Sequence, residues 1–181
     1  MEADACFNEG MIVVMAGLPG TGKSTLAREL AGRTAGRVIG KDEIRHALFS
    51  AAEVEYSSRQ DDFCLQMMLE TAGYLLEKDG SQIIFLDGRT FSRAYQIDNV
   101  LQAAEGLQQS WRILECVCSD EVARERLSDS AVAGDHPAAN RDFELYLAVR
   151  SRYEFIDLPK TVIDTEEALE SCVVRGLAAL R

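Results

Sequence analysis

Residues 17–25 of the chain read Gly17-Leu18-Pro19-Gly20-Thr21-Gly22-Lys23-Ser24-Thr25. This stretch fits the pattern G-x-x-x-x-G-K-[ST], in which the glycines permit positive φ and let backbone N–H groups approach a phosphate. We therefore predict that all of residues 17–25 bind the phosphates of ATP. The Lys23 ammonium would reach the β- and γ-phosphates, and the Ser24 hydroxyl would ligate Mg²⁺.

The sequence on either side supports a nucleotide site. Met11 to Ala16 form a continuous apolar run, which predicts a buried parallel strand leading into the glycine-rich loop. From Lys23 to Arg33 apolar residues recur at helical spacing, so the loop should open a helix. A loop that only turns the chain would not require the run Lys23-Ser24-Thr25.

Strands and helices alternate along the rest of the chain. We predict further strands at 37–39, 82–86, 111–117 and 161–163, and helices at 42–49, 59–78, 92–108, 120–127, 142–155 and 165–181. Small and polar residues at 128–140 predict a loop, and Asp164 or Thr165 would cap the last helix. This order predicts a three-layer α/β fold with a five-stranded parallel sheet, as one domain spanning 1–181.

Composition and charge restrict the class of protein. A 47% hydrophobic and 27% charged chain is typical of a globular protein, and its net charge of -11 disfavours binding along a nucleic acid. No apolar run approaches the ~20 residues that cross a bilayer, so we expect a cytoplasmic protein. The five cysteines lack Cys-x-x-Cys spacing, and neither His46 nor His136 forms a metal cluster with a close Cys or His, so zinc catalysis is not expected.

A second motif follows the phosphate loop. Gly17 to Thr25, followed at the second strand by Gly40-Lys41-Asp42-Glu43-Ile44-Arg45, resembles the P-loop kinase-like family of the AAA_33 type. That family is similar to polynucleotide 5′-kinases, zeta-toxin-like kinases and adenylylsulfate kinases. The resemblance spans most of the chain. It implies a P-loop NTPase fold of the kinase type, a lid at about 124–142, and transfer of the ATP γ-phosphate to a hydroxyl.

The resemblance implies roles for Asp42 and Arg45. In polynucleotide kinases an Arg-Asp-Asp-x-Arg segment supplies the general base and an anion-binding arginine, and Asp42 and Arg45 are the matching positions. A carboxylate beyond the second strand can accept a hydroxyl proton, and an arginine three residues later shares its helical face. The alternatives are a helix N-cap for Asp42 and an exposed helix charge for Arg45.

Asp87 directly follows the strand predicted at 82–86. An acidic group there can reach Mg²⁺, directly or through water, or bind the acceptor. The alternative is that Asp87 and Gly88 only form a turn. Arg89 and Arg93 follow closely, and they either bind an acceptor anion or lie on the solvated surface.

The resemblance also implies arginines in the lid, commonly two that are four residues apart. Arg126 fits the first position, whereas Ser130 stands at the second. The second charge is therefore missing, or Arg124 or Arg141 supplies it. Arg124 and Arg126 also fit as solvated charges of the helix predicted at 120–127.

Together these residues predict an ATP- and Mg²⁺-dependent kinase for a small-molecule hydroxyl acceptor. Asp42 would be the general base, Lys23, Arg45 and Arg126 would stabilise the transferring phosphoryl group, and Ser24 and Asp87 would hold the metal. Adenylylsulfate, a polynucleotide 5′-hydroxyl and a nucleotide sugar stay open as acceptors. Arg45 and the run from Tyr56 to Arg59 resemble adenylylsulfate kinases, but those enzymes usually carry Asp-Gly-Asp-Asn-x-Arg where this chain has Ile-Gly-Lys-Asp-Glu-Ile-Arg.

An alternative from another class is a nucleotide-binding switch or regulatory ATPase that transfers phosphate only to water. A GTPase should carry Asn-Lys-x-Asp, which the sequence lacks. A switch would also not need the pair of Asp42 and Arg45. The sequence leaves the oligomeric state open.

Overall fold

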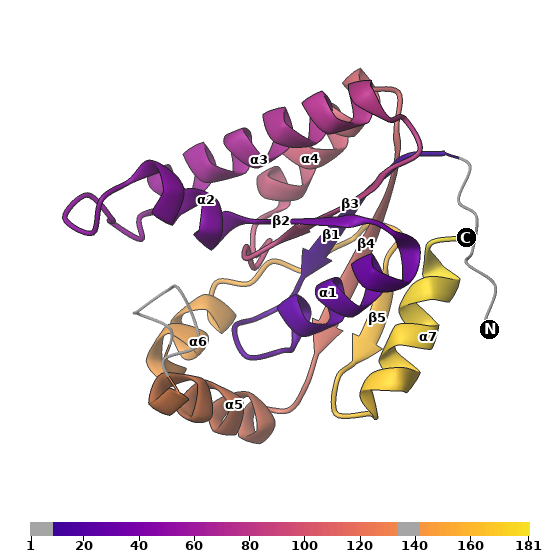
Figure 1. The fold of residues 1–181 in the computed structure, drawn as a ribbon. Coiled ribbons are helices and arrows are strands. Elements are labelled where there is room, and N and C mark those ends of the chain that lie inside the picture. The colour runs from indigo at the N-terminus through magenta and orange to yellow at the C-terminus, as the bar shows by residue number, and fades with distance from the viewer. Residues whose placement is uncertain (1–8, 134–141) are drawn as a thin grey trace.

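The computed structural model describes residues 9–133 and 142–181, with the backbone alone at 130–133. Its first strand, β1 (Met11–Ala16), is buried along its whole length and ends where the phosphate loop begins. Helix α1 (Lys23–Thr34) starts at the lysine of that loop. A strand that is apolar at every position has to be covered on both faces, and helices do so here (Figure 1).

In the described part of the chain, five strands form one sheet in which every neighbouring pair is parallel. The others are β2 (Arg37–Gly40), β3 (Ile83–Asp87), β4 (Ser110–Val117) and β5 (Thr161–Asp164), and the order is β2-β3-β1-β4-β5. The predicted five-stranded parallel sheet is confirmed. Gly40 lies opposite Asp87 in register, so the phosphate loop, Asp87 and the start of the next helix meet at the carboxyl ends of the strands.

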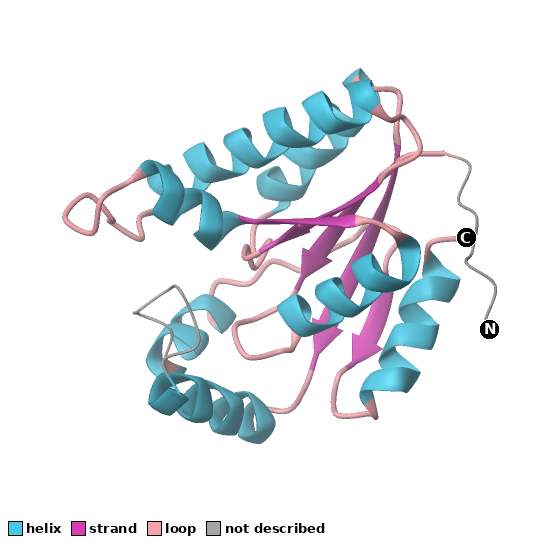
Figure 2. Ribbon diagram, in the orientation of Figure 1, coloured by secondary structure: helices cyan, strands magenta, loops and turns pink. Residues whose placement is uncertain are grey.

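Helices cover the two faces of the sheet as separate layers (Figure 2). On one face α1 and α7 (Leu169–Ala179) bury Leu26, Leu30 and Val173 against the sheet. On the other face α3 (Ser58–Lys78) and α4 (Ala94–Gly106) do so through Leu65, Met68 and Val100. The three layers are those predicted from the alternation of strands and helices.

Two helices lie beyond the carboxyl end of β4 and cover the phosphate loop (Figure 1). They are α5 (Asp120–Ala133) and α6 (Phe143–Arg150), and Leu127 and Tyr146 pack between them with Leu18 of the loop alongside. The Tyr146 hydroxyl donates to Asp120 Oδ1 at 2.7 Å. The segment 124–142, for which a lid was predicted, therefore starts inside α5, and its residues 134–141 lie outside the described part of the chain.

Three predicted boundaries differ from the structure by four residues or more, and the others differ by two at most. Helix α5 continues to Ala133, where a loop was predicted from residue 128, because alanine favours helix. Helix α6 ends at Arg150 and not at 155. Helix α7 begins at Leu169 and not at 165, and neither Asp164 nor Thr165 caps it. Both residues form hydrogen bonds before the helix begins. Asp164 Oδ1 accepts from the Glu166 N–H at 3.0 Å, and the Thr165 N–H donates to Val117 O at 2.9 Å.

Candidate active site

The phosphate loop has the backbone geometry that the motif predicts. Gly17, Gly20 and Gly22 have φ of 130°, 80° and 77°, a region that side chains rarely adopt. A Cβ atom on Gly17 would lie 2.3 Å from the carbonyl oxygen of Cys116. These positions therefore require glycine, and the absence of side chains there lets a phosphate approach the loop backbone.

The loop ends at a helix terminus suited to an anion. The N-cap of α1 is Gly22, no side chain caps the helix, and its first turn carries no acidic residue. The first N–H groups and the positive end of the helix dipole therefore point toward the loop. Lys23 Nζ donates to Leu18 O at 2.7 Å, which places the ammonium inside the loop.

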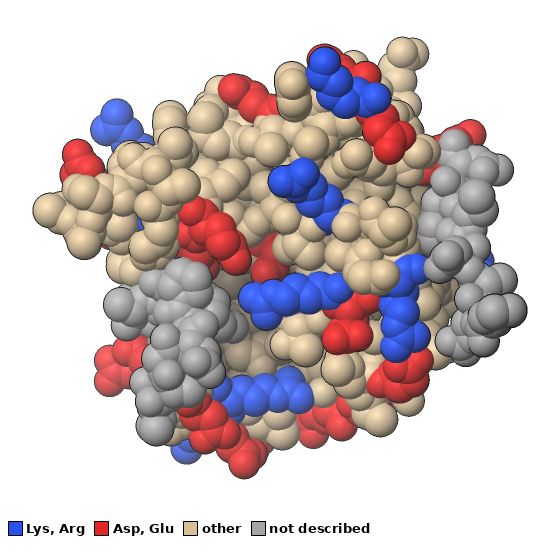
Figure 3. Space-filling model, viewed as in Figure 1, with Lys and Arg blue, Asp and Glu red and all other residues tan. Residues whose placement is uncertain are grey.

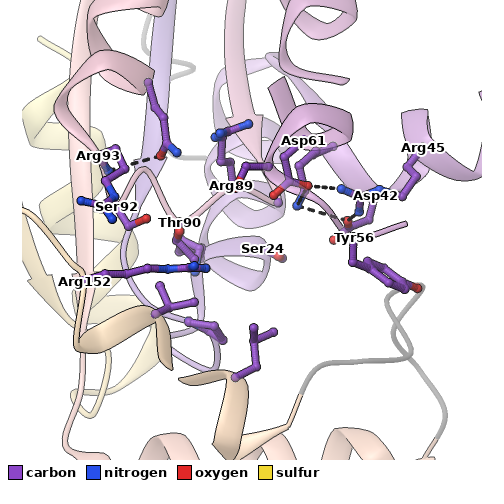
Figure 4. A pocket seen from close by; sticks show the side chains of 18 of the residues that line it. Ser24, Asp42, Arg45, Tyr56, Asp61, Arg89, Thr90, Ser92, Arg93 and Arg152 are labelled. Carbon is purple, nitrogen blue, oxygen red and sulfur yellow. Dashed lines mark hydrogen bonds and ion pairs between the residues drawn. The ribbon is translucent and has the colours of Figure 1, made fainter. Parts of the chain in front are cut away.

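A cleft of about 240 Å³ opens beside the loop (Figure 4). Lys23 and Ser24 line it together with Asp42 and Arg45. Segments far apart in the sequence line it, among them helix α2 (Lys41–Leu48). The phosphate loop contributes Pro19, Lys23 and Ser24, and α2 contributes Lys41, Asp42 and Arg45. The other lining residues come from around the start of α3 (Tyr56, Ser58, Asp61), from the segment after β3 (Arg89, Thr90, Ser92, Arg93) and from α6 and the residues after it (Leu145, Val149, Arg152).

Asp42 is the second residue of α2, and its side chain serves the cleft. The N-cap of α2 is Gly40, so the capping alternative for Asp42 is wrong. Asp42 is 7% exposed, and its Oδ1 accepts from Arg45 Nη1 at 2.5 Å. Arg45 is 0% exposed, so it is not the exposed helix charge that the other alternative proposed.

Lys41 and Asp61 complete this network, and neither was predicted as a site residue from the sequence. Asp61 Oδ1 accepts from Lys41 Nζ at 2.8 Å and from Arg45 Nη2, and Lys41 Nζ also lies 3.6 Å from Asp42 Oδ1. Two cations and two carboxylates thus hold one another beside the loop. Asp61 lies in the first turn of α3, where an acidic residue is common, so nothing in the local pattern distinguished it.

Asp87 ends β3 and is 6% exposed. Its Oδ1 is buried and has no hydrogen-bond partner among the described residues, which is costly unless a cation or donor joins it. The following Gly88 has φ of 86°, so the turn exists as well. A buried, unpartnered carboxylate oxygen and the Ser24 hydroxyl fit Mg²⁺, which takes few protein ligands and retains water and phosphate oxygens.

The buried thiol of Cys116 lies near both Lys23 and Asp87. Burial is the largest effect and raises the pKa of this thiol to about 12, while the positive charge of Lys23 lowers it and the negative charge of Asp87 raises it. Burial therefore favours the neutral form of this thiol. Within residues 9–133 and 142–181 no three His, Cys, Asp or Glu side chains form a metal-binding group.

Arg126 lies in a different pocket. Its Nη2 donates to Thr165 O at 2.7 Å and its Nη1 to Thr165 Oγ1 at 2.9 Å. This second pocket is lined by Gly20, Gly22 and Thr25 of the phosphate loop but not by Asp42. Arg126 is therefore not a solvated helix charge, and the structure does not bring it into the cleft of Asp42.

The remaining arginines have distinct environments. Arg124 lies over the Phe143 ring at 4.2 Å, and Arg141 lies outside the described residues. Arg89 is 3% exposed and donates to Asp62 at 2.6 Å, so its surface alternative is wrong. Arg93, 2.6 Å from Glu154, is half-exposed. Arg152, which the sequence analysis missed, reaches the cleft from the segment after α6.

The family model AAA_33, described as an AAA domain, matches residues 12–154, from the first strand to beyond α6. The chain belongs to the AAA_33 family. No curated protein matches this AAA_33 member by sequence. In the part of the chain that the structure describes, no helix has the length and apolar character that crossing a bilayer needs.

The fold of this AAA_33 member is shared by many solved structures, among them the following three. A protein of Chloroflexus aurantiacus proposed to be a kinase is 24% identical, with a TM-score of 0.73 over 96% of this chain and 99% of that one. The Mycobacterium tuberculosis APS kinase CysC, in complex with AMPPNP and APS, is 18% identical, with a TM-score of 0.71 over 95% and 98%. A gluconokinase of Sinorhizobium meliloti is 17% identical, with a TM-score of 0.69 over 95% and 91%.

Proposed function

We propose that this protein transfers the γ-phosphoryl group of ATP to the hydroxyl of a small-molecule acceptor, with Asp42 as the general base. The observation that carries the proposal is the cleft that joins Lys23 and Ser24 of the phosphate loop to the buried carboxylate of Asp42. A carboxylate in that position can accept the proton of a hydroxyl bound between it and the phosphate loop. The folds of an APS kinase and a gluconokinase agree with this class of reaction.

The phosphate loop and its neighbours would hold ATP. The loop N–H groups and Lys23 bind the β- and γ-phosphates, and Ser24 and Asp87 would hold Mg²⁺, which neutralises phosphate charge when bound. The second pocket adjoins the same loop on the side of Thr25, so we assign Arg126 to the nucleotide and not to the acceptor. Helices α5 and α6 act as the lid of this single domain.

The cleft residues would carry out the transfer. Asp42 accepts the hydroxyl proton while the acceptor oxygen forms a bond to the γ-phosphorus and the bond from that phosphorus to the bridging oxygen of ADP breaks. Arg45 and Lys41 hold the Asp42 carboxylate in place, and Arg45 in turn is held by Asp61. Arg45 also adds positive charge near the transferring group.

The acceptor is an alcohol, and its size is limited by the cleft. Adenylylsulfate and a sugar acid are candidates, since the structural neighbours include an APS kinase and a gluconokinase. A polynucleotide is disfavoured by the net charge of -11. On the face shown in Figure 3, basic and acidic side chains alternate and do not form a broad basic surface.

The test is acceptor-dependent turnover. Purified protein with Mg²⁺ and ATP should form ADP and a phosphorylated product only when a suitable alcohol from a metabolite panel is present. The Lys23→Ala variant serves as the control, because it should lose turnover with every acceptor. If ADP forms at the same rate with and without any acceptor, and only inorganic phosphate appears, the protein is a regulatory ATPase and the proposal is wrong.

A further inference from the structure

The cleft carries more positive than negative charge, although the whole chain has a net charge of -11. Two carboxylates line it, those of Asp42 and Asp61. The cationic side chains that line it are Lys23, Lys41, Arg45, Arg89, Arg93 and Arg152. The positive charge of the cleft is opposite in sign to the net charge of the chain. A local excess of cations in a cleft favours the binding of anions there.

Half of these cations already have a role. Lys23 belongs to the phosphate loop, and Lys41 and Arg45 are paired with Asp61 and Asp42. The other three arginines lie on the segment after β3 and on the residues that follow α6. In Figure 4, Arg93 and Arg152 lie on one side of Ser24, and Asp42 and Arg45 lie on the other. The cleft therefore has a second cationic end, opposite its carboxylates.

Arg152 is the cation at this end that forms no ion pair with a carboxylate in the described part of the chain. Its side chain extends toward Thr90 in Figure 4, and it has no ion-pair or hydrogen-bond partner within residues 9–133 and 142–181. The backbone around it is anchored. The Arg152 N–H donates to Val149 O at 3.2 Å, and the Glu154 N–H donates to Ser92 O at 2.9 Å. A fixed backbone presents this guanidinium to the cleft.

Arg89 adds a buried charge on the same side. Its Nη2 donates to Asp62, while its Nε and Nη1 are buried without a hydrogen-bond partner in the described residues. A guanidinium stays protonated at any working pH. Asp62, its counter-ion, is 41% exposed, so water screens the carboxylate more than it screens Arg89, which is 3% exposed. The field of Arg89 therefore favours an anion at this end of the cleft.

We propose that the acceptor is a hydroxylated organic anion, and that Arg152 binds its carboxylate or phosphate group while its hydroxyl faces Asp42. This inference rests on the proposed kinase function. An arginine binds carboxylate and phosphate through two parallel hydrogen bonds, which orients the bound molecule as well as holding it. Arg89 is a positioning residue that strengthens anion binding through its charge. The segment after α6 thereby selects the acceptor.

The first experiment compares acceptors of the same carbon skeleton with and without an anionic group. Turnover is measured with sorbitol against gluconate, with ribose against ribose 5-phosphate, and with glycerol against glycerate and glycerol 3-phosphate. These are tested on the wild type, on Arg152→Gln and on Arg28→Gln. Arg28 is an exposed arginine of α1 outside both pockets, so it controls for loss of a surface charge. The carboxylate and phosphate members distinguish the two possible anionic groups.

The second experiment needs no phosphorylated product. Protein saturated with Mg²⁺ and AMPPNP, so that the phosphate loop is occupied, is titrated with inorganic phosphate, sulfate and tartrate. Protection of Arg152 from phenylglyoxal, followed by peptide mass spectrometry, reports whether an anion binds there. A failure of the kinase function in the first experiment leaves this test of the anion site intact.

The inference predicts that kcat/KM is higher for the anionic member of each pair than for the neutral member. Arg152→Gln should lower kcat/KM about 10- to 100-fold for anionic acceptors only. Arg28→Gln should leave kcat/KM unchanged for both members. Anions should protect Arg152 when the phosphate loop is occupied. The inference is overturned if neutral members are the better acceptors, if Arg152→Gln affects both members equally, or, where no acceptor reacts, if no anion protects Arg152.

Discussion

Replacing Asp42 by asparagine removes a charge and a proton acceptor while it keeps the shape of the side chain. Asp42 is 7% exposed and accepts from Arg45, which is 0% exposed. The asparagine oxygen can still accept that hydrogen bond, and Asp61 still contacts Arg45. The folded network should therefore survive with a reduced balance of charge.

The expected magnitudes follow from that geometry. Loss of a general base lowers kcat by about 10² to 10⁴, which corresponds to roughly 3–5 kcal/mol in the barrier. Removing one partner of a buried ion pair costs about 3–5 kcal/mol of stability. Because Arg45 keeps Asp61, we expect Asp42→Asn to lower the free energy of unfolding by about 1–3 kcal/mol.

The assay is steady-state kcat with a working acceptor, together with urea unfolding and ATP-analogue binding. Asp61→Asn is the matched variant, since it removes the other carboxylate of the same network. Both variants should lose similar stability, but Asp42→Asn should lose at least about ten times more kcat than Asp61→Asn. An Asp42→Asn protein with more than a tenth of wild-type kcat would refute the role of Asp42 as the base.

Three further perturbations test other parts of the account. Gly17→Ala should destabilise the protein by about 3 kcal/mol and abolish nucleotide binding, because the new Cβ would meet Cys116 O at φ 130°; an unchanged urea midpoint would contradict this. Arg126→Gln should raise the KM for ATP about 10-fold and leave the KM for the acceptor unchanged. A change in the KM for the acceptor alone would contradict the assignment of Arg126 to the nucleotide. At pH 8 the Cys116 thiol, whose pKa burial raises to about 12, stays protonated and should resist iodoacetamide in the folded protein but not in urea; equal labelling rates would contradict its burial.

The parts of the fold that the sequence predicts are those with strong local signals. Within residues 11–34 the apolar run, the glycines and the helical periodicity each predict their own element: β1, the phosphate loop and α1. The structure confirms both β1 and α1. Asp42 and Arg45 are three residues apart on one helix, so their contact also follows from local geometry. Proximity in the sequence makes these contacts predictable.

Contacts between distant segments are not predictable in this way. The bonds from Lys41 and Arg45 to Asp61, and from Arg93 to Glu154, depend on how helices pack over the sheet. The late start of α7 has the same origin: the Thr165 hydroxyl is held by Thr21 O and Val117 O, so the chain has to run as a loop before the helix begins. Tertiary hydrogen bonds override the local capping pattern there.

The central claim is that the γ-phosphoryl group leaves ATP for an alcohol and not for water. It is tested most directly by turnover in ¹⁸O-labelled water with a metabolite extract as the source of acceptor, followed by mass spectrometry of both phosphate products. We predict an acceptor-dependent phosphate ester that contains no ¹⁸O, and little inorganic phosphate. If all of the released γ-phosphate is inorganic phosphate carrying one ¹⁸O, with or without the extract, the protein is a hydrolase and the claim is wrong.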